Sequence, residues 1–303
     1  MKYAWIQQHQ EKQDIEVAFS CQLLSVPISS YYSWLNKKPI SSALDKAKLV
    51  KDAFDMLQGN AGTRGIKGHL LNEHNIKMSR RLISRLMKAQ GLTCQRKRKF
   101  KRGVSAAAND PCIAANLLQR QFDVRYPNQV WVTDITYIKT LVGWMYLAVF
   151  IDLYSRKVVG WALDTHMKSE LIETALKRAL WSRKPPKGLI IHSDQGSQYV
   201  SKSYRKLLES WGLKPSMSRR GNCWDNAVAE SFFKTLKVEM VYRQPSLATP
   251  QGMRLLISDY IGHFNHVRPH SKNNYLSPAL LERRQREMAK LLDKNQIPCT
   301  EKC

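Results

Sequence analysis

Residues 130–138 read VWVTDITYI, a stretch of β-branched and aromatic residues with one aspartate at its centre. This composition predicts a β-strand, because Val, Ile, Thr, Trp and Tyr pack well on a pleated, half-buried surface. Aspartate is unfavourable in such a strand, since its neighbours favour burial and its carboxylate favours water. Asp134 therefore indicates a carboxylate with a functional role.

The sequence around this strand predicts a mixed sheet covered by helices. Two further strand patterns, residues 145–152 and 157–162, follow polar breaks, so the first three strands are expected to form a meander. Strand and helix patterns then alternate over residues 169–181, 188–192, 202–211 and 213–217, before a last helix. This order predicts an α/β fold with a mixed five-stranded sheet and flanking helices.

The last helix belongs to the segment GNCWDNAVAESFFKTLK, residues 221–237, and carries two stripes of different chemistry. Each residue of an α-helix turns by about 100°, so side chains three and four positions apart share a stripe. The apolar stripe contains Ala229, Phe232, Phe233, Leu236 and Met240. Glu230, Lys234 and Lys237 form a second stripe beside it. Merely solvated charges are expected opposite the buried face, so charges at its edge indicate a functional site.

Three carboxylates, those of Asp134, Asp194 and Glu230, lie where this layout converges. Asp194 directly follows a buried strand in GLIIHSD, at the carboxyl end where α/β folds place their ligands. If the first and fourth strands are neighbours and the last helix packs beside them, the three carboxylates meet. Like charges in a poorly solvated site raise each other's pKa unless cations compensate them. Hard oxygen ligands favour Mg²⁺ or Mn²⁺, here as a pair of ions about 4 Å apart.

Each acid alone also has an ordinary structural explanation. Asp194 could cap a turn, and Glu230 could pair with Lys234 four residues later, a contact that contributes about 0.2 to 0.5 kcal/mol. Asp134 in the middle of a strand is harder to explain in this way. The three acids together, on a strongly basic chain, favour a metal site.

The composition points to a nucleic-acid partner. Among 303 residues, 49 are Lys or Arg and 24 are Asp or Glu, which gives a formal charge of +25 and a pI near 9.9. Such a chain repels itself unless a polyanion neutralises it, and a generally soluble basic surface is the alternative. Six scattered cysteines without a Cys-x-x-Cys pair predict reduced thiols. The sequence shows neither an apolar run of roughly 20 residues nor a secretion signal, so a cytosolic protein without a membrane partner is expected.

The region before residue 95 is helical in pattern and contains two helix-turn-helix outlines. In the first, residues 15–24 and 29–35 flank a break at Pro27, and in the second, residues 65–74 lead through a turn to Ser79. The helix after Ser79 is expected to bury Leu82, Ile83, Leu86 and Met87 and to expose Arg80, Arg81, Arg85 and Lys88. This basic face suits a major groove or a row of phosphates, and an ordinary helical bundle is the alternative.

The three acids and the segments around them resemble one known superfamily. Asp134 in WVTDITYI, Asp194 in HSDQGSQY and Glu230, with 35 residues between the last two, look like the Asp-Asp-Glu signature of retroviral integrases and transposases. GNCWDNAVAESFFKTLK is similar to the segment typical of bacterial insertion-sequence transposases translated by frameshifting into a second reading frame. VFIDLYSRKVVGWAL and HFNHVRPHSKNNYLSPAL also match that family, and the resemblance extends from about residue 15 to residue 282.

This resemblance implies a ribonuclease-H-like core preceded by an all-α helix-turn-helix region. It implies a metal-dependent DNA transposase in which Asp134, Asp194 and Glu230 are both catalytic residues and metal ligands, with two ions of Mg²⁺ or Mn²⁺ per active site. Such an enzyme nicks a transposon end to free a 3′-OH and uses that group to attack another phosphodiester, in this group through a circular intermediate. Lys237, seven residues after Glu230, matches the basic residue that contacts the terminal base or phosphate. The sequence lacks the His-His-Cys-Cys zinc module of the retroviral members.

The resemblance also implies the partners. They are the terminal inverted repeats of the element, target DNA, further copies of the chain in a synaptic complex and, by frameshifting, an upstream-frame helix-turn-helix protein. The expected location is the bacterial cytoplasm, in association with the nucleoid. Contacts with DNA are expected from Lys234, Lys237, Arg80, Arg81, Arg85, Lys88, Arg96, Lys97, Arg98, Lys99 and Trp224. Trp224 either anchors its loop by packing or stacks on a base at the cleaved end.

These patterns divide the chain into a helix-turn-helix DNA-binding region (1–94), a basic linker (95–124), an integrase catalytic core (125–285) and a C-terminal tail (286–303). Two rival functions stay open. One is a ribonuclease-H-like endonuclease that shares the core and only hydrolyses. The other is a non-catalytic DNA-binding regulator, in which the basic helices bind DNA and the acids have lost their role.

Overall fold

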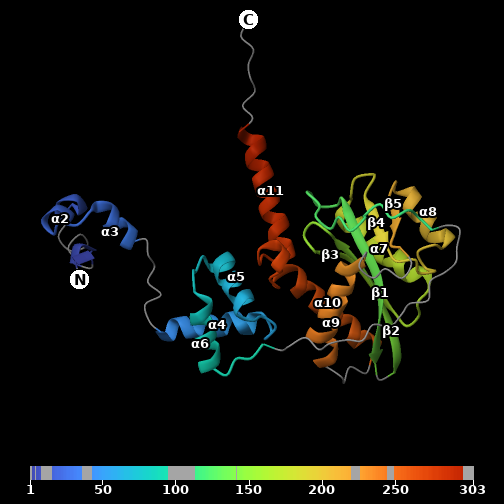
Figure 1. Ribbon diagram of the computed structural model, residues 1–303, viewed down its shortest axis with the longest axis horizontal. Helices are drawn as coiled ribbons and strands as arrows, with labels where there is room; N and C mark the ends of the chain where they lie inside the picture. Colours follow the sequence, from blue (N-terminus) through green and yellow to red (C-terminus); the bar gives the residue numbers. More distant parts are fainter. Residues whose placement is uncertain are drawn as a thin grey trace, which may run out of the picture. The chain divides into compact units, whose positions relative to one another are not determined.

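The computed structural model of the chain is drawn in Figure 1. It describes residues 2–3, 5–7, 16–35, 43–94, 113–140, 142–219, 226–243 and 249–295. The chain divides into two compact units, Met1–Val50 and Lys51–Cys303. The described part of the first unit is helical, and the second unit contains further helices and the sheet.

The first unit contains the helix, break and helix predicted from the sequence. Helix α2 (Val17–Leu23) is followed by Ser25, whose φ of 50° is left-handed, and α3 (Ile28–Leu35) begins directly after Pro27. A residue with left-handed φ cannot continue a helix, so the chain turns sharply here. The small core of this unit consists of Ile6, Cys21 and Tyr31.

The second predicted helix pair is confirmed as α5 (Thr63–His74) and α6 (Arg80–Ala89). Asn75 ends α5 with a left-handed φ of 54°, which asparagine tolerates better than most residues. Ser79 caps α6, because its hydroxyl accepts a hydrogen bond of 3.2 Å from the N–H of Leu82. The predicted core positions of α6 are buried or half-buried: Leu82, Ile83, Leu86 and Met87. Its predicted cations are exposed: Arg80, Arg81, Arg85 and Lys88.

A further helix, α4 (Ala43–Met56), precedes this pair and was not predicted. Its sequence, ALDKAKLVKDAFDM, alternates Lys and Asp with a few small apolar residues, which gives a weak periodic signal. Val50 and Ala53 are nevertheless buried, as is Leu57 just beyond the helix. Tertiary packing of this narrow stripe, rather than intrinsic propensity, therefore stabilises the helix.

The second unit is built on the predicted five-stranded mixed sheet. In spatial order its strands are β3 (Val158–Asp164), β2 (Gly143–Asp152), β1 (Val130–Thr140), β4 (Ile190–Ser193) and β5 (Lys214–Met217). The first three strands pair antiparallel as the expected meander, while β4 and β5 run parallel to β1. This is the ribonuclease-H-like topology, and it confirms that the first and fourth strands are neighbours.

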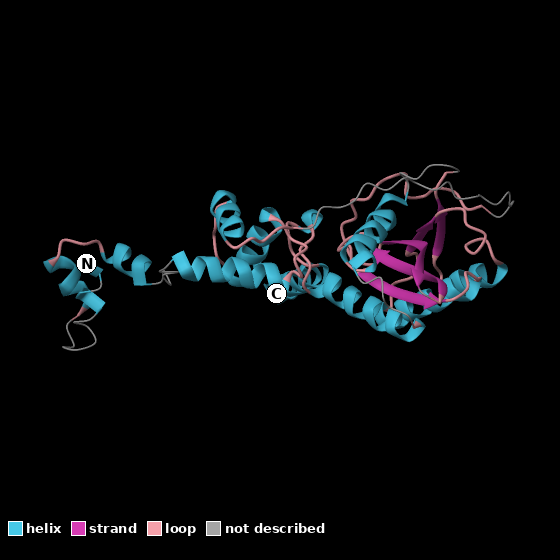
Figure 2. Cartoon of the chain, turned by 90° about the horizontal axis from the view of Figure 1, so that it is seen from below, coloured by secondary structure: helices cyan, strands magenta, loops and turns pink. Residues whose placement is uncertain are grey.

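Helices cover both faces of the sheet, whose strands are magenta in Figure 2. On one face α7 (Ser169–Arg183) and α8 (Lys202–Ser210) pack against Trp131 and Phe150. Helix α7 lies directly on β3, since a Cβ at Gly160 would stand 2.4 Å from the carbonyl oxygen of Ala175. The opposite face is covered by α9 (Ala227–Glu239) and α10 (Pro250–His266).

The C-terminal segment is bound to α7 and to the turn after β2 by polar contacts of Glu282. Two short helices, η2 (Val241–Arg243) and η3 (Ser271–Asn273), precede α11 (Pro278–Asn295). Helix α11 continues past residue 286, where the C-terminal tail was predicted to begin. Near the start of α11, Glu282 accepts hydrogen bonds from Arg183 at 2.7 and 2.9 Å.

Among the helices that the structure describes, none is long and apolar enough to cross a lipid bilayer.

Candidate active site

Asp134 lies half-buried in β1, at the centre of the predicted acid cluster. One of its carboxylate oxygens accepts a hydrogen bond of 2.8 Å from the N–H of Ile135. Burial raises the pKa of Asp134 well above its ordinary value, and the carboxylates of Asp194 and Glu230 raise it further. The hydrogen bond from Ile135 and the positive charge of Lys237 act in the opposite direction. Asp134 is therefore within electrostatic reach of both other predicted acids.

Asp194 follows β4 immediately, beside the strand of Asp134. Strand β4 runs parallel to β1, with His192 opposite Val132. Asp194 and Asp134 each lie two residues further along, so they lie at the same height along the paired strands. The N–H of Gly196 donates a hydrogen bond of 3.0 Å to Oδ1 of Asp194, and burial raises the pKa of this carboxyl group. A Cβ at Gly196 would stand 3.0 Å from the same oxygen, so glycine lets the backbone approach the carboxylate.

Glu230 lies half-buried in the first turn of α9, where the helix dipole favours a carboxylate. Asn226, directly before the helix, donates a hydrogen bond of 3.1 Å from Nδ2 to the carbonyl oxygen of Thr133. Because Thr133 precedes Asp134, this bond fixes the start of α9 beside the strand of Asp134. The predicted apolar stripe of α9 is buried on the sheet: Ala229, Phe232, Phe233, Leu236 and Met240.

Thr133 also connects β1 to the turn after β4. Its hydroxyl oxygen lies 3.2 Å from the phenolic oxygen of Tyr199, and both side chains are buried. Burial raises the pKa of Tyr199 well above its ordinary value, and the charges of Asp134 and Asp194 raise it further, so the phenol stays protonated. Tyr199 was not predicted as a site residue, although it ends the segment HSDQGSQY. Nothing in its local pattern distinguishes it from a tyrosine that only fills the core.

The two lysines of the charged stripe differ in their surroundings. Lys234 is exposed, whereas Lys237 is half-buried with its Nζ 4.6 Å from the centre of the Tyr137 ring. Burial lowers the pKa of Lys237, and the charge of Asp134 acts against that shift. Lys237 is thus the lysine that stands beside the acids.

The other residues predicted to contact DNA fall into two groups. Arg80, Arg81, Arg85 and Lys88 are exposed on α6, as described above. The remaining ones, Arg96, Lys97, Arg98, Lys99 and Trp224, lie outside the described residues.

The donor atoms around Asp134 are carboxylate oxygens, the ligands that Mg²⁺ and Mn²⁺ prefer. Within the described parts of the chain, no group of three or more His, Cys, Asp or Glu side chains stands arranged to hold a metal ion. The pKa of Asp134 is nevertheless raised, first by burial and also by the neighbouring carboxylates. A bound cation would counteract both effects, because its positive charge stabilises the ionised carboxylate. The residues therefore fit a divalent cation in chemistry.

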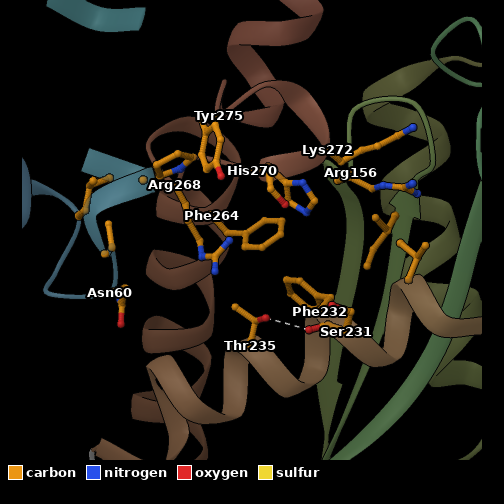
Figure 3. Close-up of a pocket in the computed structure, with 18 of the residues that line it drawn as sticks. Asn60, Arg156, Ser231, Phe232, Thr235, Phe264, Arg268, His270, Lys272 and Tyr275 are labelled. Atoms are coloured by element: carbon orange, nitrogen blue, oxygen red, sulfur yellow. Dashed lines mark hydrogen bonds between the residues drawn. The ribbon is translucent and has the colours of Figure 1, made fainter. Parts of the chain in front are cut away.

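A cavity of about 440 Å³ lies elsewhere in the second unit (Figure 3). Its lining comes from the turn before α5, the end of β2 and the turn after it, α9, and the segment from α10 to η3. Asp134, Asp194 and Glu230 are not part of it. Two of its cations already have acidic partners, since Arg268 is bound to Glu239 and Lys272 to Asp123. The cavity is therefore separate from the three predicted acids, and its bound cations leave it without a role in the acid site.

Known families and proteins match nearly the whole chain. Two integrase core domain families match residues 125–223 and 211–278, and an HTH-like domain family matches residues 42–100. Transposase InsF for insertion sequence IS3A of Escherichia coli (strain K12) is 36% identical over 288 residues, which cover 93% of this chain and 98% of that protein. An uncharacterized 31 kDa protein of insertion element IS600 from Shigella sonnei is 40% identical over 273 residues, which cover 89% of this chain and 99% of that protein.

Among solved structures, the HTLV-2 integrase catalytic core domain in complex with magnesium is 19% identical, with a TM-score of 0.41. The match covers 52% of this chain and 97% of that one.

The sheet and the domain matches define the class of protein: an enzyme in which an HTH-like domain is followed along the chain by an integrase catalytic core. The chain belongs to the IS3 family of insertion-sequence transposases. The resemblance drawn from the three acid-bearing segments is confirmed at this level.

Proposed function

We propose that this transposase cleaves the ends of its insertion sequence to free a 3′-OH and then uses that group in strand transfer. The observation that carries the proposal is the convergence of the acid-bearing segments: β4 runs parallel to β1, and Asn226 ahead of Glu230 is hydrogen-bonded to Thr133. The charges of Asp194 and Glu230 accordingly raise the pKa of the half-buried Asp134, beyond the effect of burial. Titratable groups perturbed by burial and by specific neighbouring charges are typical of catalytic sites. Membership of a transposase family supports the same conclusion.

The three acids would be the ligands of two Mg²⁺ or Mn²⁺ ions. Asp134 and Asp194 would hold or bridge both ions, and Glu230 would complete the second site. When bound, such a pair supplies activation of the attacking oxygen and stabilisation of the leaving oxygen of a phosphodiester. The carbonyl of Thr133 holds the start of α9 beside β1, and the N–H of Gly196 orients the carboxylate of Asp194, so that these carboxylates would need little reorganisation.

Basic residues would orient the DNA around the acids. Lys237, beside Asp134, would contact the phosphate or base at the cleaved end, and the exposed Lys234 would contact the backbone further along. The helix-turn-helix DNA-binding region would hold the terminal repeat through Arg80, Arg81, Arg85 and Lys88, and the basic linker through Arg96, Lys97, Arg98 and Lys99. Phosphate contacts of this kind set position and affinity, while base contacts set sequence. Trp224 would pack its loop or stack on a base.

The partners would be terminal inverted repeats, target DNA and further copies of the chain in the synaptic complex, with an upstream-frame helix-turn-helix protein as an additional one. The proposal keeps the division of the chain into a helix-turn-helix DNA-binding region (1–94), a basic linker (95–124), a catalytic core (125–285) and a C-terminal tail (286–303). It also keeps the circular intermediate, in which one end of the element is first joined to the other.

Two rivals are separated by the products of one reaction. Wild-type protein is incubated with DNA that carries the element's terminal repeat, with and without Mg²⁺ or Mn²⁺. Joined strands are expected. Cut fragments alone would favour an endonuclease, and DNA binding without any metal-dependent product would favour a regulator.

The roles of the acids are tested by near-isosteric substitution. Asp134→Asn, Asp194→Asn and Glu230→Gln should each abolish cleavage and joining while leaving DNA binding in place. Asp259→Asn, which changes an exposed aspartate of α10, is the control and should keep activity. Joining by the Asp134→Asn protein at the rate of the control would overturn the mechanism.

A further inference from the structure

Three of the large aromatic side chains that stand exposed in the second unit are Tyr137 of β1, Trp144 of β2 and Tyr242 of η2. Their exposed fractions are 58%, 49% and 46%. The rings of Tyr137 and Trp144 meet edge to face, with centroids 5.3 Å apart. Burial raises the pKa of Tyr242, and Tyr137 raises it further. These three residues are here called the aromatic platform.

The aromatic platform is exposed because the hairpin of β1 and β2 extends beyond its neighbours. Strand β4 pairs with β1 over Val130–Val132, and β3 pairs with β2 over Tyr146–Ile151. Tyr137 lies opposite Tyr146, which places Trp144 diagonal to Tyr137 on the same face of the hairpin. Aromatic surface therefore projects from the end of the sheet into solvent.

Lys237 connects the aromatic platform to the acids. Its Nζ lies 4.6 Å from the centre of the Tyr137 ring, a cation–π contact. The charge of the same lysine interacts with Asp134, three residues before Tyr137 on the strand. Lys237 thus contacts the ring of Tyr137 and interacts electrostatically with Asp134.

The chemistry of this surface selects its ligand. Exposed aromatic rings bind flat apolar faces, and the ammonium group of Lys237 adds a site for an anion beside them. A nucleobase with its phosphate presents both features. DNA is the better occupant of this surface, because a polyanion neutralises the formal charge of +25 that each copy of the chain carries, whereas a second copy without DNA adds like charge.

We propose that the aromatic platform stacks an unpaired base at the DNA end that enters the acid site. This rests on the proposed function, since it assumes that a DNA end reaches Asp134. Stacking would hold the frayed nucleotide away from its complement and keep the terminal phosphodiester beside the acids. Base–aromatic stacking tolerates any sequence, so the aromatic platform would serve both ends of the element.

The test uses a fluorescent base. A duplex with one terminal repeat of the element carries 2-aminopurine as its last base, and its fluorescence falls when the base stacks on an aromatic ring. Wild-type protein should quench the fluorescence. Trp144→Leu and Tyr137→Leu should reduce the quenching and weaken binding of this DNA by about 5- to 150-fold. Trp144→Phe and Tyr137→Phe should keep most of both.

The control is Trp181→Leu, because Trp181 is 78% exposed near the end of α7, two residues before Arg183, which binds Asn128 ahead of β1. It should bind and quench as wild type does. Thermal melting of each variant excludes loss of the fold as the cause. Equal quenching by the Trp144→Leu and Trp181→Leu proteins would overturn the proposal. So would loss of self-association by Trp144→Leu in sedimentation without change in quenching, which would show a contact between copies.

The joining reaction of wild-type protein on the same duplex separates the two proposals. Joined product with undiminished quenching in the leucine variants leaves the transposase in place and removes the base-stacking role. Quenching that depends on Trp144, without any joined product, supports base stacking and contradicts the proposed function.

Discussion

The amide of Asn226 donates a hydrogen bond of 3.1 Å to the carbonyl oxygen of Thr133, and both residues are buried. Asn226 directly precedes the helix of Glu230, and Thr133 directly precedes Asp134. The hydroxyl of Thr133 also meets the phenol of Tyr199, in the turn that follows Asp194. One residue of β1 therefore holds the three acid-bearing segments together, without being an acid itself.

Asn226→Ala should lower activity more than it lowers stability. Loss of the bond should cost about 1 to 3 kcal/mol in the free energy of unfolding, because the carbonyl of Thr133 is left without this donor. Activity should fall by about tenfold or more, since the start of α9 shifts relative to β1. Chemical denaturation and strand-transfer assays measure the two effects.

The matched control is Asn273→Ala, which removes a buried amide-to-carbonyl bond of 2.7 Å to Ser155. That protein should lose similar stability and keep its activity per folded molecule. Equal activities of the two variants would contradict a positioning role for Asn226.

Thr133→Val and Tyr199→Phe test the second link by a double-mutant cycle. Each single change leaves one buried hydroxyl without its partner and should destabilise the protein by about 1 to 3 kcal/mol. The double variant removes both hydroxyls and should be more stable than the sum of the single effects predicts. Additive losses in chemical denaturation would show that the 3.2 Å contact contributes nothing.

Gly196→Ala should impair catalysis while leaving the fold in place. The added Cβ would stand 3.0 Å from Oδ1 of Asp194 and 3.2 Å from Oε1 of Gln198, so the carboxylate must shift by a few tenths of an ångström. About a tenfold loss of strand transfer is expected, with DNA binding unchanged.

Gly262→Ala serves as the control, because a Cβ there meets nothing within 4 Å in helix α10. This change should raise stability by about 0.5 to 1 kcal/mol and keep full activity. Full activity of Gly196→Ala would mean that Asp194 does not need its present position.

The parts of the site that could be predicted from sequence are those with a local pattern. Asp134 is recognisable because a carboxylate interrupts a β-branched strand, and Glu230 because it lies at the edge of an apolar helical stripe. The contacts of Asn226 and Tyr199 with Thr133 join residues that are 93 and 66 positions apart. Such contacts depend on how the strands and helices pack, and polar residues in turns give no periodic signal of it.

Acid should destabilise the fold in part through Glu282. Burial alone would raise the pKa of this glutamate, but Arg183, Ser155 and Lys157 outweigh burial and hold the pKa below its ordinary value. A depressed pKa means that the stabilisation is complete above the unfolded value of about 4.3 and is lost as pH falls through the folded value.

Glu282→Gln removes one partner of a buried pair and should cost about 3 to 5 kcal/mol at neutral pH. The variant should also lose less stability than wild type on acidification below about pH 5, because it lacks the titrating group. Thermal melting over a pH series measures both. Parallel curves for the two proteins would show that Glu282 does not carry this dependence.

The exposed cations of α6 should govern the salt dependence of DNA binding. A plot of log affinity against log salt has a negative slope, and each phosphate contact that is lost reduces the magnitude of this slope by about 0.9. Arg81→Ala should reduce the magnitude by about that amount, and replacement of Arg80, Arg81, Arg85 and Lys88 together should reduce it by about 3.6. The control is Arg283→Ala on α11, whose side chain is 64% exposed and lies near Glu287. A slope equal to that of wild type in the fourfold variant would show that α6 does not contact DNA and belongs to an ordinary helical bundle.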